Sequence, residues 1–284
     1  MNLRSLRLEG EPKVERNRSE NSELDSSPVR VVITGAAGVI GSVLRRRLAD
    51  GYVIRGLDRK RTREHGVDRV DVTRLKALDD AFAGADAVID LAASAQVETP
   101  WPEVWKNNLR GTMNALEAAR RNGVARFVYA SSNHVTGMYE REFPYSEIVA
   151  GEYSQLDPSS IPLIDSNTPV RPDGPYAIGK VLGEAAARYY ADVFGLRTIC
   201  LRIGTVNPED QPKHARDFAT LLTHADLIRL CECALQAPDD LRFGICYGVS
   251  DNTWRFWDIA EARNAIGYLP QDDAEHLRPT APTD

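Results

Sequence analysis

The chain has 284 residues, of which 43% are hydrophobic and 27% charged, and its formal net charge is −6 at pH 7. This length suits one domain with a sizeable core, or one domain with a smaller appendage. The acidic balance argues against nucleic acid as a partner, because phosphate binding usually leaves a basic surface. No apolar run approaches the roughly 20 residues that a membrane-spanning helix needs, so we expect no membrane partner either.

The cysteines and the first 27 residues set further limits. Cys200, Cys231, Cys233 and Cys246 show no C-x-x-C pair and no interleaved histidines. We therefore predict no metal site, and four reduced core residues of a cytoplasmic protein. Residues 1–27 have no apolar signal-peptide region, and we expect them to form a disordered leader.

The first ordered elements are a strand over 29–34 and a helix over 39–49. Three glycines, Gly35, Gly38 and Gly41, join the two elements. Glycine at such a junction allows a sharp turn, close approach of the backbone to a pyrophosphate and close helix packing. The phosphates would then lie at the positive end of the helix. The pattern predicts dinucleotide binding, and the alternative is a glycine-rich turn without a nucleotide.

A second strand, over 52–57, ends at Asp58, 23 residues after Gly35. An acidic residue at about this distance accepts hydrogen bonds from the adenosine ribose. Its carboxylate would repel a 2′-phosphate, which favours NAD over NADP. The three cations at 59–61 could bind that phosphate instead, or form a solvated loop, so NADP stays possible.

The alternation of strands and helices continues along the chain. We expect strands over 67–72, 86–94 and 125–132, and helices over 74–84 and 101–122. This order predicts a parallel, doubly wound α/β sheet of the Rossmann type. Asp71 would approach the adenine. The remaining cofactor contacts are predicted at Val39, Ile40, Val72, Leu91, Ala92, Ala93 and Ile203.

Polar residues crowd the end of the strand over 125–132. There Ser131, Ser132, Asn133 and His134 follow an apolar run. Ligands of open α/β sheets bind at the carboxyl ends of the strands, so we expect this cluster beside the cofactor crevice.

A helix over 175–194 carries a second candidate group. Pro175 suits its first turn, and Tyr176 and Lys180 lie four residues apart on one face. Tyr-x-x-x-Lys alone is common on exposed faces. Beside a dinucleotide, however, an ammonium and an oxidised nicotinamide would both favour the phenolate of a tyrosine whose pKa is ordinarily near 10. Tyr176 would then take a proton from a substrate oxygen that Ser132 orients.

Together these motifs resemble the extended short-chain dehydrogenases/reductases, the NAD-dependent epimerase/dehydratase group. The resemblance covers residues 29–272 and rests on TGAAGVIG, Asp58, NNLRGT, SSN, YAIGK and LRIGTVNP. It implies that Ser132, Tyr176 and Lys180 are catalytic and that Asn108 supports the proton relay. Tyr176 and Lys180 would also contact the NAD.

Within the group, the segments ASSNHVTGMY, RPDGPYAIGK, RIG and YGVSDN are most similar to uronate dehydrogenases and archaeal NAD-dependent glucose-6-phosphate dehydrogenases. Both oxidise a sugar at its anomeric carbon. The resemblance thus implies an oxidoreductase that turns a uronic acid or a hexose phosphate into a lactone. It places Arg216 where uronate dehydrogenases bind the substrate carboxylate, although a lone loop arginine is often only surface charge. The other predicted sugar contacts are Ser94, Ser132, Asn133, His134 and Thr205, with a hydrogen-bonded loop histidine as the alternative for His134.

The carboxyl-terminal part is small. Only 80 residues follow Gly204, with a helix expected over 224–237, a strand over 242–249 and a helix near 254–267. This is enough for a lid over a monosaccharide, whereas nucleotide-sugar epimerases need a larger lobe. We read Trp254, Phe256 and Trp257 as core of this lobe rather than as a sugar-stacking platform.

These expectations divide the chain into an NAD-binding Rossmann domain over 28–204, a substrate-binding lobe over 205–272 and a tail over 273–284. The domain contains a loop insertion over 138–173, which is longer than its uronate dehydrogenase counterpart. Because the loop leads into the catalytic helix, it could reshape the sugar pocket.

Other activities would use the same motifs. An epimerase or a carbonyl reductase of this group would keep the three catalytic residues, and a non-catalytic NAD sensor would need only the glycines. A dehydratase would need an acidic pair where Asn133 and His134 stand. The resemblance also implies a homodimer, and the outward faces of the helices over 101–122 and 175–194 look apolar enough to pair.

Overall fold

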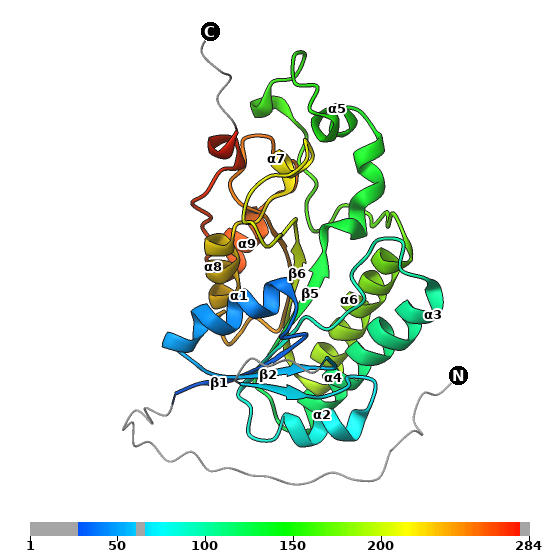
Figure 1. Ribbon diagram of the computed structural model, residues 1–284, viewed down its shortest axis with the longest axis vertical. Coiled ribbons are helices and arrows are strands. Elements are labelled where there is room, and N and C mark those ends of the chain that lie inside the picture. Colours follow the sequence, from blue (N-terminus) through cyan, green and yellow to red (C-terminus); the bar gives the residue numbers. More distant parts are fainter. Residues whose placement is uncertain (1–27, 61–65, 279–284) are drawn as a thin grey trace, which may run out of the picture.

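The computed structural model describes residues 28–60 and 66–278, so the predicted leader, Arg61 and the end of the predicted tail lie outside the described residues. At its centre is a parallel sheet in the order β3-β2-β1-β4-β5-β6-β7 (Figure 1). This confirms the predicted doubly wound sheet. The strands are β1 (Arg30–Thr34), β2 (Val53–Asp58), β3 (Val67–Arg69), β4 (Ala87–Asp90), β5 (Arg126–Ser132), β6 (Arg197–Ile203) and β7 (Phe243–Gly248).

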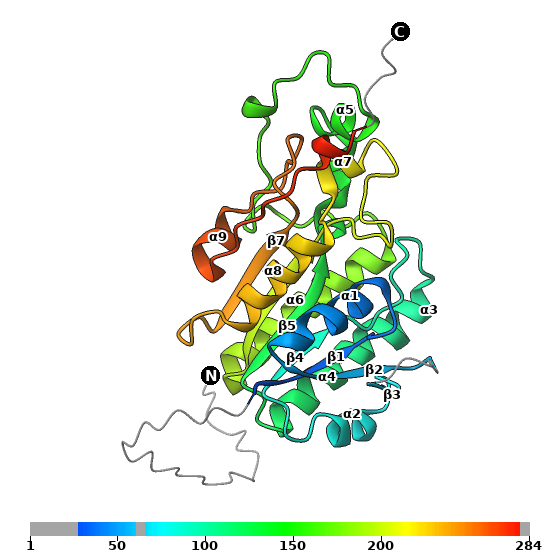
Figure 2. The ribbon, with the colours of Figure 1, turned by 60° about the vertical axis from the view of Figure 1, so that its left-hand side comes forward.

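Helices cover both faces of the sheet (Figure 2). One layer holds α1 (Val39–Arg47), α8 (His224–Leu235) and α9 (Ala260–Ile266), and the other holds α2 (Leu75–Ala81), α4 (Arg110–Arg121) and α6 (Pro175–Phe194). Side chains alternate along β1, so Val31 and Ile33 pack with the first layer and Val32 packs with the second. Both faces are therefore buried, which explains why the strands are almost continuously apolar.

The helix predicted over 101–122 consists of three joined pieces. α3 (Trp101–Glu103) leads into a π-helical segment (Val104–Leu109), which leads into α4. The π-helical segment carries Asn107 and Asn108. Widened helical turns of this kind are frequent at functional sites.

The segment over 138–173 packs against the carboxyl-terminal lobe. It contains α5 (Tyr145–Ala150), which the sequence did not predict, and Figure 1 shows α5 grouped with α7 (Asp217–Thr220). Ile164 shares a buried cluster with Phe256 and Trp257. The backbones also pair, because Ile164 N donates to Phe256 O at 2.8 Å. The segment and the residues around Phe256 and Trp257 thus form a layer beyond the ends of the strands, whereas β7, α8 and α9, which were predicted as part of the lobe, belong to the sheet and its first helix layer.

The helix predicted near 254–267 is shorter than expected and begins at Ala260. Before it, the backbone pairs with the loop, since Asp258 N donates to Ile164 O at 2.9 Å. The Asp258 carboxylate then accepts from Ala260 N at 2.8 Å, which starts the helix at that point. A long-range pairing has therefore replaced the first half of the predicted helix.

The strand predicted over 67–72 ends at Arg69. Beyond it, the Asp71 carboxylate accepts from Thr73 N at 2.9 Å and from Thr73 Oγ1 at 2.8 Å. This local turn draws the chain out of the sheet. Asp71 and Val72 consequently lie after the strand rather than within it.

Other predicted core residues lie where expected. Phe256 and Trp257 are fully buried, and Trp254 stacks on Tyr153 with ring centroids 4.1 Å apart. The four cysteines are free, and all but Cys233 are buried. Within the described ranges, no helix combines the length and the apolar character needed to cross a membrane.

Candidate active site

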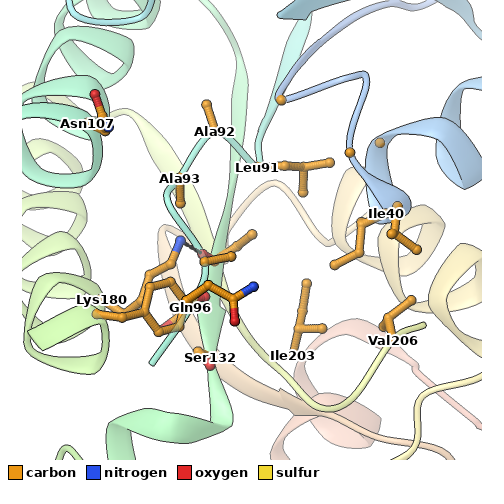
Figure 3. A pocket seen from close by; sticks show the side chains of 18 of the residues that line it. Ile40, Leu91, Ala92, Ala93, Gln96, Asn107, Ser132, Lys180, Ile203 and Val206 are labelled. Atoms are coloured by element: carbon orange, nitrogen blue, oxygen red, sulfur yellow. Dashed lines mark hydrogen bonds between the residues drawn. The ribbon is translucent and has the colours of Figure 1, made fainter. Parts of the chain in front are cut away.

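A cavity of about 580 Å³ opens at the carboxyl ends of the strands, where the strand order reverses between β1 and β4 (Figure 3). Ligands of doubly wound folds bind at this position. The predicted site residues that line it are Gly35, Gly38, Val39, Ile40, Gly41, Asp58, Asp71, Val72, Leu91, Ala92, Ala93, Ser132, Asn133, His134, Tyr176, Lys180, Ile203 and Thr205. One cavity therefore brings together the predicted cofactor residues and three of the four predicted catalytic residues, Ser132, Tyr176 and Lys180.

The three glycines form a tight cradle at one end of the cavity. Gly35 has φ +65°, and a Cβ there would lie 3.0 Å from Ala92 N. A Cβ on Gly41 would lie 2.5 Å from Gly35 O, and Gly38 is the N-cap of α1. Because the cradle has no room for side chains and ends at a helix N-terminus, it fits a pyrophosphate.

The Gly41→Ala substitution should weaken NAD binding. The new methyl group must push the cradle apart, and overpacking of this kind costs about 1–3 kcal/mol, which corresponds to about 5-fold to 150-fold in Kd. Titration calorimetry with NAD measures the change, and a thermal melt checks the fold. Gly51→Ala is the matched control, since its φ is −116° and no atom lies within 4 Å of the added Cβ. Equal NAD affinity in both variants would contradict the cradle.

Asp58 is fixed at the end of β2. Its Oδ2 accepts from Ala37 N at 3.0 Å, and its Oδ1 accepts from Lys60 N at 2.8 Å. Arg59 and Lys60 line the same cavity as Asp58. Asp58, whose carboxylate favours NAD, thus lies beside Arg59 and Lys60, which could bind the 2′-phosphate of NADP.

Ser132, Tyr176 and Lys180 are all buried, with at most 8% of each residue exposed. Lys180 Nζ donates to Ala130 O at 2.5 Å and lies 5.6 Å from the centre of the Tyr176 ring. Burial lowers the pKa of Lys180 to about 8, although the charge of Asp90 opposes this. A serine hydroxyl, a phenol and an amine therefore lie together in one buried site.

The pKa of Tyr176 in the protein alone is higher than the sequence suggested. The sequence-based expectation was that the charges of Lys180 and an oxidised nicotinamide together favour the phenolate. In the protein alone, burial raises this pKa to about 12, the hydrogen bond with Ser132 lowers it, and the charge of Asp173 raises it. Desolvation of the phenolate therefore outweighs the stabilisation that the neighbouring side chains provide.

Asn133 and His134 offer polar groups at the same end of the cavity. Asn133 is 2% exposed, and its Nδ2 has no hydrogen-bond partner among the residues that the structure describes. His134 Nδ1 lies 2.6 Å from Asp173 Oδ2, which orients the ring. An unpaired buried donor is rare in proteins, so Asn133 Nδ2 is a candidate ligand contact.

Three predicted residues lie outside the lining of this cavity. Asn108 Oδ1 accepts from Ser94 N at 2.8 Å and Asn108 Nδ2 donates to Ser94 O at 3.1 Å, so the two residues hold each other. Arg216 forms an ion pair with Glu140 and reaches the cavity only through Thr205, to which its Nη1 donates at 3.2 Å. Asn108 and Ser94 support the cavity wall, whereas Arg216 lies behind it.

The cavity also contains residues that the sequence analysis missed. Gln96, Asn107 and Val206 line it (Figure 3). Asn107 could have been found from its place beside Asn108 in NNLRGT, and its Nδ2 donates to Ser94 Oγ at 3.1 Å. Nothing in the sequence singles out Gln96, which lies in the loop after β4.

The sequence matches the NAD dependent epimerase/dehydratase family over residues 31–226. The NAD-dependent glucose-6-phosphate dehydrogenase of Haloferax volcanii is 34% identical over 86% of this chain and 94% of that protein. The L-arabinose 1-dehydrogenase (NAD(P)(+)) of the same organism is 33% identical over 86% of this chain and 97% of that protein. A solved structure of a mutant uronate dehydrogenase from Agrobacterium tumefaciens, complexed with NAD, is 30% identical over 90% of this chain and 92% of that chain, with a TM-score of 0.73. As its motifs predicted, the chain belongs to the NAD dependent epimerase/dehydratase family.

Proposed function

We propose that this chain oxidises a monosaccharide at its anomeric carbon to a lactone, with Tyr176 as the general base. By its family and its dehydrogenase relatives, the chain is an NAD-dependent oxidoreductase. The observation that supports the proposal is the single cavity in which Ser132, Tyr176 and Lys180 lie with the glycine cradle. Oxidation of an alcohol needs both a base for the hydroxyl proton and a nucleotide held beside it.

In this mechanism the chain holds the sugar and removes a proton. The chemistry that NAD supplies when bound is acceptance of the hydride from the anomeric carbon. Ser132 orients the anomeric hydroxyl, and Tyr176, deprotonated to the phenolate, takes the proton of that hydroxyl as the carbon–oxygen bond becomes the lactone carbonyl. Lys180 stays beside the Tyr176 ring, because its Nζ donates to Ala130 O at 2.5 Å.

The ring hydroxyls of the sugar are bound by neutral groups. Asn133 Nδ2 supplies a buried donor without a partner, and Thr205 lines the same cavity. Because Asp173 occupies Nδ1 of His134, the other ring nitrogen is the one available to a hydroxyl. A uronic acid or a hexose phosphate, as the sequence predicts, would also need a cation, and the predicted cation is Arg216.

An absorbance assay for reduced nicotinamide tests the proposal. We expect the purified protein to reduce NAD with at least one of galacturonate, glucuronate, glucose 6-phosphate, glucose, galactose, xylose and arabinose, and to release the matching lactone. An epimerase would interconvert sugars with no net reduction of NAD. A carbonyl reductase would act only with reduced cofactor and a carbonyl compound. Either of these results would contradict the proposal.

We also propose that the active form is a homodimer joined through α6. Within the single chain, α6 exposes apolar side chains on one face, including Leu182, Tyr189 and Val193. Nearby on the preceding helical segments, Trp101 and Trp105 are 43% and 62% exposed. Solvent-facing apolar patches of this kind usually mark an interface.

The Leu182→Glu substitution should turn the dimer into a monomer, because it places a charge in the apolar face of α6. Light scattering after size exclusion measures the mass. Leu269→Glu is the control, since Leu269 is an exposed apolar residue away from α6, with 56% exposure. A wild-type monomer, or a dimer that survives Leu182→Glu and not Leu269→Glu, would contradict this arrangement.

A further inference from the structure

Arg216, the residue predicted to bind a substrate anion, already binds a carboxylate of this chain. Its Nε donates to Glu140 Oε2 at 2.6 Å, and its Nη2 donates to Glu140 Oε1 at 2.7 Å. Two parallel hydrogen bonds of this kind are the strongest arrangement that a guanidinium and a carboxylate form. The pair is partly shielded from water, with 25% of the Arg216 side chain and 13% of the Glu140 side chain exposed.

The Nη1 group of Arg216 is engaged as well. Its Nη1 donates to Thr205 Oγ1 at 3.2 Å and to Thr220 Oγ1 at 3.4 Å. Burial lowers the pKa of Arg216, but the hydrogen bonds and charge of Glu140 outweigh this and raise the pKa above its usual value. The guanidinium is thus charged, fixed and engaged by protein groups.

The surroundings of Arg216 carry an excess of negative charge. Besides Glu140, the carboxylates of Asp217 and Asp173 act on the guanidinium. Asp173 also holds His134, which lines the cavity. At this end of the cavity the carboxylates of Glu140, Asp217 and Asp173 therefore favour a neutral or cationic ligand over an anion.

We propose that the sugar substrate is a neutral aldose, because Glu140 neutralises Arg216 and closes the anion site. The proposal rests on the sugar dehydrogenase function argued above and narrows its substrate class. A uronate or a hexose phosphate could reach Arg216 only by displacing Glu140 or by lying beside its carboxylate. In the first case the Glu140 carboxylate loses its counter-charge, and in the second case it repels the anion. Both arrangements are strongly unfavourable.

Neutral hydroxyls, by contrast, find suitable partners in the same cavity. Asn133 Nδ2 is an unpaired donor, and Gln96 and Thr205 add uncharged polar side chains. Glu140 belongs to the segment over 138–173, which leads into α6 and was predicted to reshape the sugar pocket. The segment thus changes the pocket by contributing a counter-charge.

Matched sugars test the proposal directly. We expect kcat/KM of the wild-type protein to be at least about 100-fold higher for glucose than for glucuronate or glucose 6-phosphate, and likewise for galactose over galacturonate, since a like charge nearby costs several kcal/mol. The Glu140→Gln substitution keeps the shape but frees the charge of Arg216. It should raise kcat/KM for the anionic sugars relative to their neutral partners by about tenfold or more.

Two control variants separate this effect from general damage. Glu142→Gln removes a charge two residues away, where Glu142 pairs with Arg171, and it should leave the ratio unchanged. The double variant Glu140→Gln with Arg216→Gln should lose the gain for anions, because the guanidinium that Glu140→Gln sets free is then absent. Thermal melts and NAD titration check that each variant is folded. If Glu140→Gln does not fold, the comparison of neutral and anionic sugars with the wild-type protein still tests the preference for a neutral substrate.

The outcomes distinguish this inference from the proposed function. A wild-type preference for glucuronate, galacturonate or glucose 6-phosphate would overturn the neutral substrate while leaving sugar oxidation intact. A folded Glu140→Gln variant with an unchanged ratio would overturn the role of Glu140. Absence of NAD reduction with every sugar of both classes would overturn the proposed function and this inference together.

Discussion

Replacing Tyr176 with phenylalanine should lower kcat/KM for sugar oxidation by about 10³-fold, because a positioned general base contributes about 10²–10⁴-fold to such reactions. The phenol oxygen is the only atom lost, so the cavity keeps its shape. Lys180 cannot replace the base while its ammonium donates to Ala130 O. NAD affinity should change little, since the glycine cradle lies elsewhere in the cavity.

Steady-state rates and NAD titration of the same preparation measure both parts of this expectation. Tyr145→Phe is the matched control, because Tyr145 is another buried tyrosine, and its hydroxyl donates to Pro162 O at 3.0 Å in the segment over 138–173. Burial also raises the pKa of Tyr176 to about 12, so kcat/KM of the wild-type protein should rise with pH across the neutral range. A Tyr176→Phe variant with more than about a tenth of wild-type activity would rule out Tyr176 as the base.

Most of the fold could be predicted because its signals are local. The apolar runs of β1 and β4 and the helix that follows Gly38 depend on residues close in sequence. One exception, the helix that begins late at Ala260, involves contacts between distant residues. The first half of the helix predicted near 254–267 is absent because Ile164, far away in the chain, pairs with that stretch.

In the candidate site, too, features set by residues close in sequence could be predicted, whereas features set by distant contacts could not. The glycines, Asp58, Tyr176 and Lys180 form recognisable short motifs, and the structure brings all of them to one cavity. The state of Arg216 could not be predicted, because its partner Glu140 is 76 positions away. A single sequence does not tell a guanidinium that waits for a ligand from one that a carboxylate of the same chain already occupies.

The buried pair of Arg202 and Glu184 contacts Ser131, the residue before Ser132. Arg202 donates from Nε to Glu184 Oε1 and from Nη2 to Oε2, both at 2.9 Å. Only 2% and 6% of the two side chains are exposed. Ser131 Oγ donates to Glu184 Oε1 at 2.6 Å, so the pair also holds the end of β5. Ser132 and Asn133 are the next two residues in the chain.

The Arg202→Met substitution should therefore lower the free energy of unfolding by about 3–5 kcal/mol, because it leaves the buried Glu184 carboxylate without the guanidinium that pairs with it. This corresponds to a fall in Tm of about 10 °C for a chain of this size. Thermal and urea unfolding measure the loss. Lys76→Met is the control, since it breaks an ion pair with Asp80 in which the two side chains are 87% and 66% exposed, and should cost less than about 1 kcal/mol.

A second variant shows whether the buried charge itself is the cause. Replacing both partners, Arg202→Met with Glu184→Leu, removes the uncompensated carboxylate and should restore much of the stability, because well-packed apolar residues often replace a buried ion pair at little cost. Activity should recover less than stability, since Ser131 then lacks the acceptor that fixes the end of β5. If the double variant were no more stable than Arg202→Met alone, the loss would come from packing of the arginine stem and not from the unpaired charge of Glu184.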